Sequence, residues 1–192
     1  MPKEFELKYR ANDKIIHAIR EKYGDFQEIA METTYYDTAD DGLSHRRWTL
    51  RRRMENGVCV CTLKTPGGQH ARNEFQTDAS DILSAIPMLC AQGAPEELKE
   101  LVKDGIAPVC GAKFTRLAKT LAADGAEVEL ALDFGYLTGG SKVLPIWEVE
   151  VELKEGAEEA AVAFAETLAA EFGLTAEARS KFARAKALAS LP

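Results

Sequence analysis

Glu4-Phe5-Glu6-Leu7-Lys8, near the N-terminus, alternates charged and apolar residues. Side chains along a β-strand point alternately to opposite faces. A strand here therefore carries Glu4, Glu6 and Lys8 on one face, and Phe5 and Leu7 on the other. For one strand taken alone, the simplest interpretation is that the charged face is solvated, because charged side chains are mostly exposed.

The same separation into an apolar face and a charged face recurs in four further segments. Like charges that follow one another along a strand repel and stabilise nothing by themselves. Their recurrence favours a barrel in which the polar faces point inward, where carboxylates and cationic groups have a purpose. The residues that share these faces are Arg51 and Arg53; Arg72, Glu74 and Gln76; Glu127, Glu129 and Asp133; and Glu148, Glu150 and Glu152.

The remaining periodicity predicts a mostly antiparallel β protein with helices near its start, middle and end. Asn12-Asp13 is typical of a helix cap, Gly24 of a helix end, and Asn56-Gly57 of a tight hairpin turn. The fold class is α+β, with a sheet large enough to curl into a barrel. Strands are predicted over residues 4–10, 26–37, 46–54, 57–65, 70–77, 108–120, 126–137 and 144–154, and helices to about residue 23, over 81–89 and 95–103, and from about 157 to 188 with a break near 173.

Composition sets limits on location and partners. The chain has 192 residues, 46% of them hydrophobic, and a net charge of −7. That acidic balance argues against a nucleic-acid or anionic-membrane binder. No signal peptide and no apolar run long enough for a membrane span are apparent. The four cysteines lack zinc-site spacing, and reduced thiols fit a cytoplasmic location.

Inward carboxylates beside inward arginines and lysines indicate chemistry on a polyanion with hard divalent cations. Arginine grips phosphate oxygens as a bidentate fork, and carboxylates suit Mg²⁺ or Mn²⁺. Phosphoryl transfer needs this combination, because its catalysis is largely positioning and electrostatic stabilisation. No P-loop motif, histidine cluster or nucleophile–histidine pair offers another route.

The order of motifs resembles that of CYTH domains, the triphosphate tunnel metalloenzymes. Glu4-x-Glu6-x-Lys8 is similar to the ExExK signature of that family. The similarity covers almost the whole chain, in the family's order. Its other parts are Tyr35-Tyr36-Asp37-Thr38, Leu50-Arg51-Arg52-Arg53, Thr62-Leu63-Lys64, Arg72-Asn73-Glu74, Phe114-Thr115-Arg116, Glu129 to Asp133, Glu150-Val151-Glu152-Leu153-Lys154 and Ser180-Lys181-Phe182-Ala183-Arg184.

The resemblance implies an eight-stranded antiparallel barrel, open as a tunnel, that forms a single domain over residues 1–192. It implies Lys8, Glu4 and Glu6 as catalytic residues, with Lys8 helping to bind substrate or orienting the attacking water. Glu127 and Glu148 extend the acidic faces beyond the motifs, and Lys113 has the parity opposite to Arg116, so these three receive no role. The implied triphosphate ligands are Arg51, Arg53, Lys64, Arg72, Arg116 and Lys181, and the implied ligands of Mg²⁺ or Mn²⁺ are Glu4, Glu6, Glu74, Glu129, Asp133, Glu150 and Glu152.

Within the family, the chain is most similar to bacterial inorganic triphosphatases of the kind fused to a CHAD domain. No CHAD domain follows here, so the chain is either a stand-alone version or part of a longer protein. The expected reaction is hydrolysis of tripolyphosphate to pyrophosphate and phosphate. Class IV adenylyl cyclase, thiamine triphosphatase and nucleoside triphosphatase activities stay open, as does a non-catalytic polyphosphate-binding module. The oligomeric state is not fixed by the sequence, and a homodimer is allowed.

Overall fold

The strands of the protein close into an antiparallel barrel. The computed structural model describes residues 3–67 and 71–191. Its strands pair in the order β5-β4-β3-β2-β6-β7-β8-β1, and a further β1–β5 pairing joins the two ends. The short strand β9 adds to β1. The expected eight-stranded barrel with flanking helices is confirmed.

The elements follow the sequence pattern closely. The strands are β1 (Lys3–Arg10), β2 (Gln27–Asp37), β3 (Thr49–Glu55), β4 (Val58–Pro66), β5 (Ala71–Asp78), β6 (Ala107–Ala123), β7 (Ala126–Gly139), β8 (Lys142–Gly156) and β9 (Thr175–Ala176). The helices are α1 (Asp13–Tyr23), α2 (Gly42–His45), α3 (Ile82–Ala91), α4 (Glu97–Leu101), α5 (Glu158–Phe172) and α6 (Lys181–Ala189).

Local signals account for most of the element ends. The Asn12 side chain accepts a hydrogen bond from Ile15 N at 3.0 Å and starts α1. Asn56 and Gly57 both have positive φ, +48° and +88°, as a tight hairpin turn between β3 and β4 requires. The Asn56 side chain also accepts a hydrogen bond from Ala30 N at 2.8 Å, which ties the turn to β2.

Some boundaries differ from the sequence-based expectation. β3 begins at Thr49 rather than at residue 46, because the chain first forms the short helix α2, which the sequence pattern did not predict. Arg47 after it has φ +56°. β9 was not expected, since a strand of two residues has no periodicity to detect. Residue 70 of the expected strand 70–77 lies outside the described residues.

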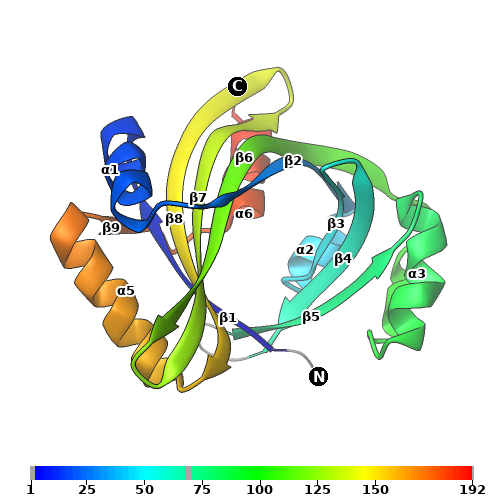
Figure 1. Cartoon of the computed structure of the whole chain (residues 1–192). Coiled ribbons are helices and arrows are strands. Elements are labelled where there is room, and N and C mark those ends of the chain that lie inside the picture. Colours follow the sequence, from blue (N-terminus) through cyan, green and yellow to red (C-terminus); the bar gives the residue numbers. More distant parts are fainter. Residues whose placement is uncertain (1–2, 68–70, 192) are drawn as a thin grey trace.

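Helices cover the outside of the barrel on two sides. Figure 1 shows α1 and α5 on the outer side of β7 and β8, and α3 beside β4 and β5. The first group buries an apolar cluster that includes Ile19, Leu130 and Leu168, and the second buries one that includes Leu63 and Leu89. These clusters use the outward apolar residues of the strands, so the charged faces are left to the inside. None of the described helices is long and apolar enough to cross a membrane.

Helix α6 lies on the opposite, concave side of the curved strands (Figure 1). It packs against β6, β7 and β8. Phe182 and Ala185 join an apolar cluster with Tyr35, Phe114 and Leu137. This helix therefore contacts the inside of the barrel and brings residues from the end of the chain to that surface.

Gly139 is where β7 touches α6 most closely. A Cβ atom at residue 139 would lie 2.3 Å from Ala185 O and 2.5 Å from Ala189 N. We expect Gly139→Ala to lower the free energy of unfolding by about 1–3 kcal/mol, the usual cost of overpacking a well-packed contact. Urea unfolding measures this change, with the exposed turn variant Ser141→Ala as control. Equal stability of both variants would contradict the close contact.

Candidate functional site

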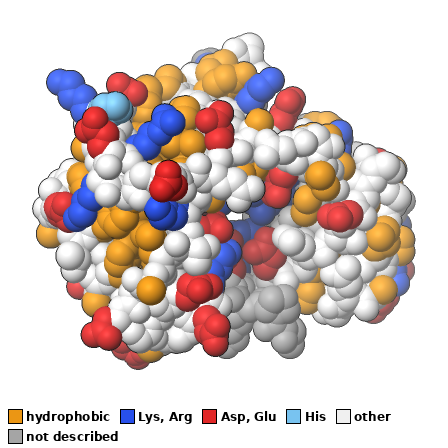
Figure 2. All heavy atoms as spheres, viewed as in Figure 1, with side chains coloured by type: hydrophobic (Ala, Val, Ile, Leu, Met, Phe, Trp, Pro, Cys, Tyr) orange, Lys and Arg blue, Asp and Glu red, His pale blue; other side chains and the backbone are white. Residues whose placement is uncertain are grey.

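The inside of the barrel is lined with charged side chains from nearly every strand. Figure 2 shows acidic and basic side chains gathered around a hollow at the centre of the molecule. Two adjoining cavities occupy this interior and share Glu4, Arg51, Arg53 and Arg116 in their walls. Strand parity explains the arrangement, since alternate residues of each strand point inward.

A group of three guanidinium groups forms the centre of the tunnel: Arg51 and Arg53 from β3, and Arg116 from β6. Burial, together with the charges of Arg51 and Arg116, lowers the pKa of Arg53 to about 10. Arg53 Nε donates a hydrogen bond to Thr33 Oγ1 at 3.1 Å, which orients the guanidinium group of Arg53. Among the described residues, Arg51 Nε is buried and has no hydrogen-bond partner. Concentrated positive charge with an unused donor fits an anion.

Further cations surround this group from β1, β4, β5 and α6. Lys8, Lys64, Arg72 and Lys181 all line the cavity on the α6 side. Lys64 forms an ion pair with Glu4, and its Nζ lies 3.7 Å from Glu74. The Lys8 side chain is only 8% exposed, and its described ion-pair partner is Glu6 at 3.8 Å. All the residues predicted to bind phosphate therefore face one chamber.

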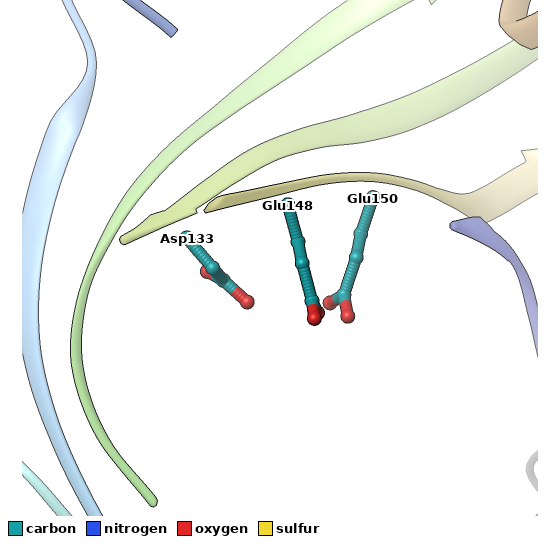
Figure 3. A group of neighbouring side chains, drawn as sticks. All are labelled: Asp133, Glu148 and Glu150. Carbon is teal, nitrogen blue, oxygen red and sulfur yellow. The ribbon is translucent and has the colours of Figure 1, made fainter. Parts of the chain in front are cut away.

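Asp133, Glu148 and Glu150 form a buried acidic cluster. Figure 3 shows their side chains pointing to the same side of β7 and β8. Oxygens of the three lie within 4.8 Å of one another, close enough to hold one metal ion. In this structure Lys181 Nζ lies among them, at 2.7 Å from Asp133, 2.8 Å from Glu148 and 2.7 Å from Glu150.

Arginines complete the neutralisation of this cluster. Arg116 donates to both oxygens of Asp133, at 2.8 and 2.7 Å, and also to Glu150. Burial alone would raise the pKa of Glu150, but the charges of Lys181 and Arg116 outweigh it and hold that pKa well below its usual range. Arg184 forms an ion pair with Glu148. Buried charges of this kind persist because each has a partner.

Glu148 and Arg184 are site residues that the sequence analysis left without a role. Glu148 shares the inner face of β8 with Glu150 and Glu152, and its side chain is only 1% exposed. Its alternation with Glu150 and Glu152 along the strand could have identified it, but the family motif used to choose site residues begins only at Glu150. Arg184 stands one helical turn after Lys181 on α6, so both reach the same carboxylate.

A second acidic group lines both cavities, with Glu6 in the first and Glu129 and Glu152 in the second. Glu6 faces Glu152 across the β1–β8 pair, and Glu152 faces Glu129 across the β7–β8 pair. Burial raises the pKa of Glu152; the charges of Glu4 and Glu129 add to this, and Lys154 opposes it. Carboxylates placed opposite one another are destabilising, so this row favours a divalent cation, which would relieve the repulsion.

Glu74 and Lys113 lie where strand parity places them, whereas Glu127 does not line the tunnel although it has the parity of Glu129. Glu74 lies between two of the cations, 3.5 Å from Arg51 and 3.7 Å from Lys64. Lys113 lies outside the barrel and pairs with Glu32 at 3.5 Å, where both side chains are more than half exposed. Glu127 is exposed where the register between β7 and β8 shifts. Lys113 and Glu127 are thus not part of the tunnel.

The protein is thus a closed antiparallel β-barrel whose interior is lined by both cationic and anionic side chains. The family model of the CYTH domain matches residues 2–185, and the chain belongs to this family. The family resemblance drawn from the sequence motifs is thereby confirmed.

Among curated proteins, the chain is similar to the inorganic triphosphatase of Haemophilus influenzae. The two are 28% identical over 199 aligned residues. The alignment covers 99% of this chain and 56% of the relative, so the chain spans little more than half of that protein's length.

Solved structures share the fold at low sequence identity. One is a putative adenylyl cyclase from Hippeastrum described as having a dominant triphosphatase activity, with a TM-score of 0.67, 18% identity and coverage of 100% of this chain and 98% of that one. Another is a putative adenylate cyclase from Bacillus halodurans, with a TM-score of 0.66, 16% identity and coverage of 96% and 98%. These likenesses concern the fold.

Glu177 anchors the segment that leads into α6. Its backbone N donates to Lys8 O at 2.9 Å, and its carboxylate accepts hydrogen bonds from Arg10 Nε at 2.8 Å and Arg179 N at 3.0 Å. Burial alone would raise the pKa of Glu177, but these bonds and the charge of Arg184 outweigh it and lower the pKa to about 2. The ionised carboxylate therefore ties β1 to the start of α6.

Because the folded-state pKa of Glu177 lies below its unfolded value, its stabilising effect is complete above about pH 4.5 and is lost as the pH falls toward 2. We expect Glu177→Gln to lower the free energy of unfolding at pH 7, with a difference from the original protein that shrinks as the pH falls through this window. Urea unfolding at several pH values measures it. The exposed variant Glu166→Gln is the control; a difference for Glu177→Gln that does not depend on pH would contradict the assignment.

Proposed function

We propose that this protein hydrolyses inorganic triphosphate to pyrophosphate and phosphate inside its tunnel. The observation that carries the proposal is the buried group Arg51, Arg53 and Arg116. Burial and the neighbouring charges of Arg51 and Arg116 lower the pKa of Arg53, and Arg51 Nε is a buried donor without a hydrogen-bond partner among the described residues. A polyanion with many oxygens would relieve both conditions, because each guanidinium can grip phosphate as a fork.

Similarity to a curated inorganic triphosphatase supports the choice of substrate. That relative is 28% identical, and its alignment takes in essentially all of this chain. The aligned part therefore includes every side chain that we place in the tunnel, among them Lys181 of α6 and Glu4 of β1.

We assign the divalent cation to the second acidic group, formed by Glu4, Glu6, Glu129 and Glu152. Burial raises the pKa of Glu152, and the charges of Glu4 and Glu129 add to this effect; oxygen ligands of this kind suit Mg²⁺ or Mn²⁺. A bound ion would neutralise phosphate charge and lower the pKa of a water molecule. Glu74, Asp133 and Glu150, which the motifs also suggest as ligands, act in this proposal as partners of the tunnel's cations.

Lys8 lies where it can orient the attacking water or the phosphate that the water attacks. It lies on the strand of Glu4 and Glu6, faces Glu150 across the β1–β8 pair, and lines the cation-rich cavity. In the reaction, a water oxygen forms a bond to a terminal phosphorus and the bridging P–O bond breaks. Pyrophosphate then leaves with the bridging oxygen. Lys8 can orient the water or hold the terminal phosphate, while Lys64 and Arg72 hold the rest.

Other activities fit the same scaffold less directly. A class IV adenylyl cyclase, a thiamine triphosphatase or a nucleoside triphosphatase needs a binding surface for an organic group beside the tunnel. A non-catalytic polyphosphate-binding module needs the cations but not the crowded carboxylates Glu129 and Glu152. The presence of these carboxylates favours catalysis.

A phosphate-release panel tests the proposal. It compares tripolyphosphate, ATP, thiamine triphosphate and pyrophosphate with Mg²⁺ or Mn²⁺, and assays cyclic AMP formation from ATP. We expect the highest kcat/KM for tripolyphosphate. Faster turnover of an organic triphosphate would favour the corresponding alternative, and binding without turnover of any compound would favour the binding module.

Arg53→Ala should weaken the binding of triphosphate, because it removes a buried fork from the central group. A charge-assisted hydrogen bond contributes about 1.5–3 kcal/mol, so we expect KM to rise about 10- to 100-fold. Arg52→Ala is the matched control, since Arg52 comes from the same strand but its Nε donates to Cys59 Sγ at 3.3 Å. An equal effect of the two variants would remove Arg53 from the substrate site.

Glu152→Gln should abolish metal-dependent turnover while the protein stays folded, because the amide keeps the shape but loses the charge that binds the cation. Initial rates over a range of Mg²⁺ and Mn²⁺ concentrations measure this, and thermal unfolding checks the fold. Glu155→Gln, at the exposed end of the same strand, should behave as the original protein. Turnover by Glu152→Gln with an unchanged metal dependence would refute the metal assignment.

A further inference from the structure

The charge of the tunnel changes sign along its length. The cavity on the α6 side is lined by seven cationic residues and three acidic ones: Lys8, Arg51, Arg53, Lys64, Arg72, Arg116 and Lys181, against Glu4, Glu6 and Glu150. The adjoining cavity has five acidic residues and four cationic ones: Glu4, Glu55, Glu74, Glu129 and Glu152, against Arg51, Arg53, Arg116 and Lys154.

Most carboxylates of the second cavity have a role already. Glu4, Glu129 and Glu152 belong to the proposed metal group, and Glu74 lies between Arg51 and Lys64. Glu55 is different, because it stands on β3, which is not adjacent to β7, β8 or β1 in the barrel. A metal ion bound by the other carboxylates therefore does not require it.

Strand register places Glu55 on the inner wall. It is paired with Met31 across β2 and β3, and both residues line the second cavity. Along the inner face of β3 the order is Arg51, Arg53 and then Glu55 at the end of the strand. The Glu55 carboxylate lies 3.4 Å from Arg53 Nη1 and is 34% exposed. It is thus the first charge that follows the central arginines on this wall.

We propose that Glu55 is a specificity-determining residue that limits the length of the linear polyphosphate the tunnel accepts. The inference rests on the proposed function. Phosphates held by Lys181, Arg116, Arg53 and their neighbours fill the cationic cavity. A longer chain that extends past Arg53 along the β3 wall meets the negative charge of Glu55. Short polyphosphates are thereby favoured over long ones.

The effect is electrostatic and of limited range. Glu55 is partly exposed, so the repulsion between its carboxylate and an added phosphate is reduced by water and by salt. Removing the charge should raise the relative use of longer chains by about fivefold, and reversing it by about tenfold or more, at low ionic strength. The gain should fall as salt is added, because salt screens exposed charges over about 10 Å at 0.1 M.

The experiment compares Glu55→Gln and Glu55→Lys with the original protein. The measured quantity is the ratio of kcat/KM for linear tetraphosphate, and for longer linear polyphosphate, to kcat/KM for tripolyphosphate, at low and high salt. Glu32→Lys is the matched control: Glu32 is the neighbour of Met31 on β2, but it lies on the outer surface beside Lys113. We expect the ratio to rise in both Glu55 variants, most in Glu55→Lys, and to stay unchanged in Glu32→Lys.

An unchanged ratio in both Glu55 variants overturns the inference, as does an equal rise in Glu32→Lys, which would point to a general charge effect. Calorimetric binding of the same polyphosphates in the absence of divalent cations provides a second readout. If the original protein binds these compounds but hydrolyses none of them, the proposed function fails, while the ratio of binding constants still decides the role of Glu55.

Discussion

Inside the barrel, the ammonium group of Lys181 lies among the buried carboxylates of Asp133, Glu148 and Glu150 and compensates their charge. Three carboxylates brought this close inside a protein repel one another, and each would lose its hydration as well. The ammonium group of Lys181, with Arg116 and Arg184, supplies the compensating charge. Because Lys181 and Arg184 come from α6, the barrel interior is neutralised only when the end of the chain docks on strands from its middle.

Closure of the sheet into a barrel turns the charged faces of the strands toward one interior. The contact of β1 with β5 joins the two ends of the sheet order, so the inward faces of eight strands converge on one axis instead of facing solvent. The closing contact pairs Glu4 with Arg72, and the β1–β8 pairing makes Glu6 and Glu152 cross-strand neighbours although they are far apart in the chain. Outward apolar residues are covered by α1, α3 and α5, which leaves the interior polar. The tunnel is thus a consequence of which face of each strand the helices cover.

Two glutamates on the same strand, Glu150 and Glu152, have pKa values shifted in opposite directions by their surroundings. Glu150 has a pKa well below its usual range because Lys181 and Arg116 outweigh its burial. Glu152, the next inward residue on the same strand, has a raised pKa because burial and the charges of Glu4 and Glu129 outweigh Lys154. Glu150 therefore has Lys181 and Arg116 as counter-ions, whereas Glu152 has Lys154 at 2.9 Å and lies near two further carboxylates.

Alternation and turn chemistry are local properties, and they were sufficient to predict the strands, the Asn56-Gly57 hairpin and the separation of charged from apolar faces. The motifs from Glu4 to Lys181 were likewise readable, because the family keeps them in order. The sequence did not reveal that Glu148 and Arg184 pair, that Glu55 ends a basic row at the wider cavity, or which carboxylates are neutralised. Those outcomes depend on barrel register and on the docking of α6, which bring together side chains such as those of Arg184 and Glu148, 36 residues apart in the chain. Periodicity determines which way a side chain points, whereas the charge that it meets is decided only by the tertiary structure.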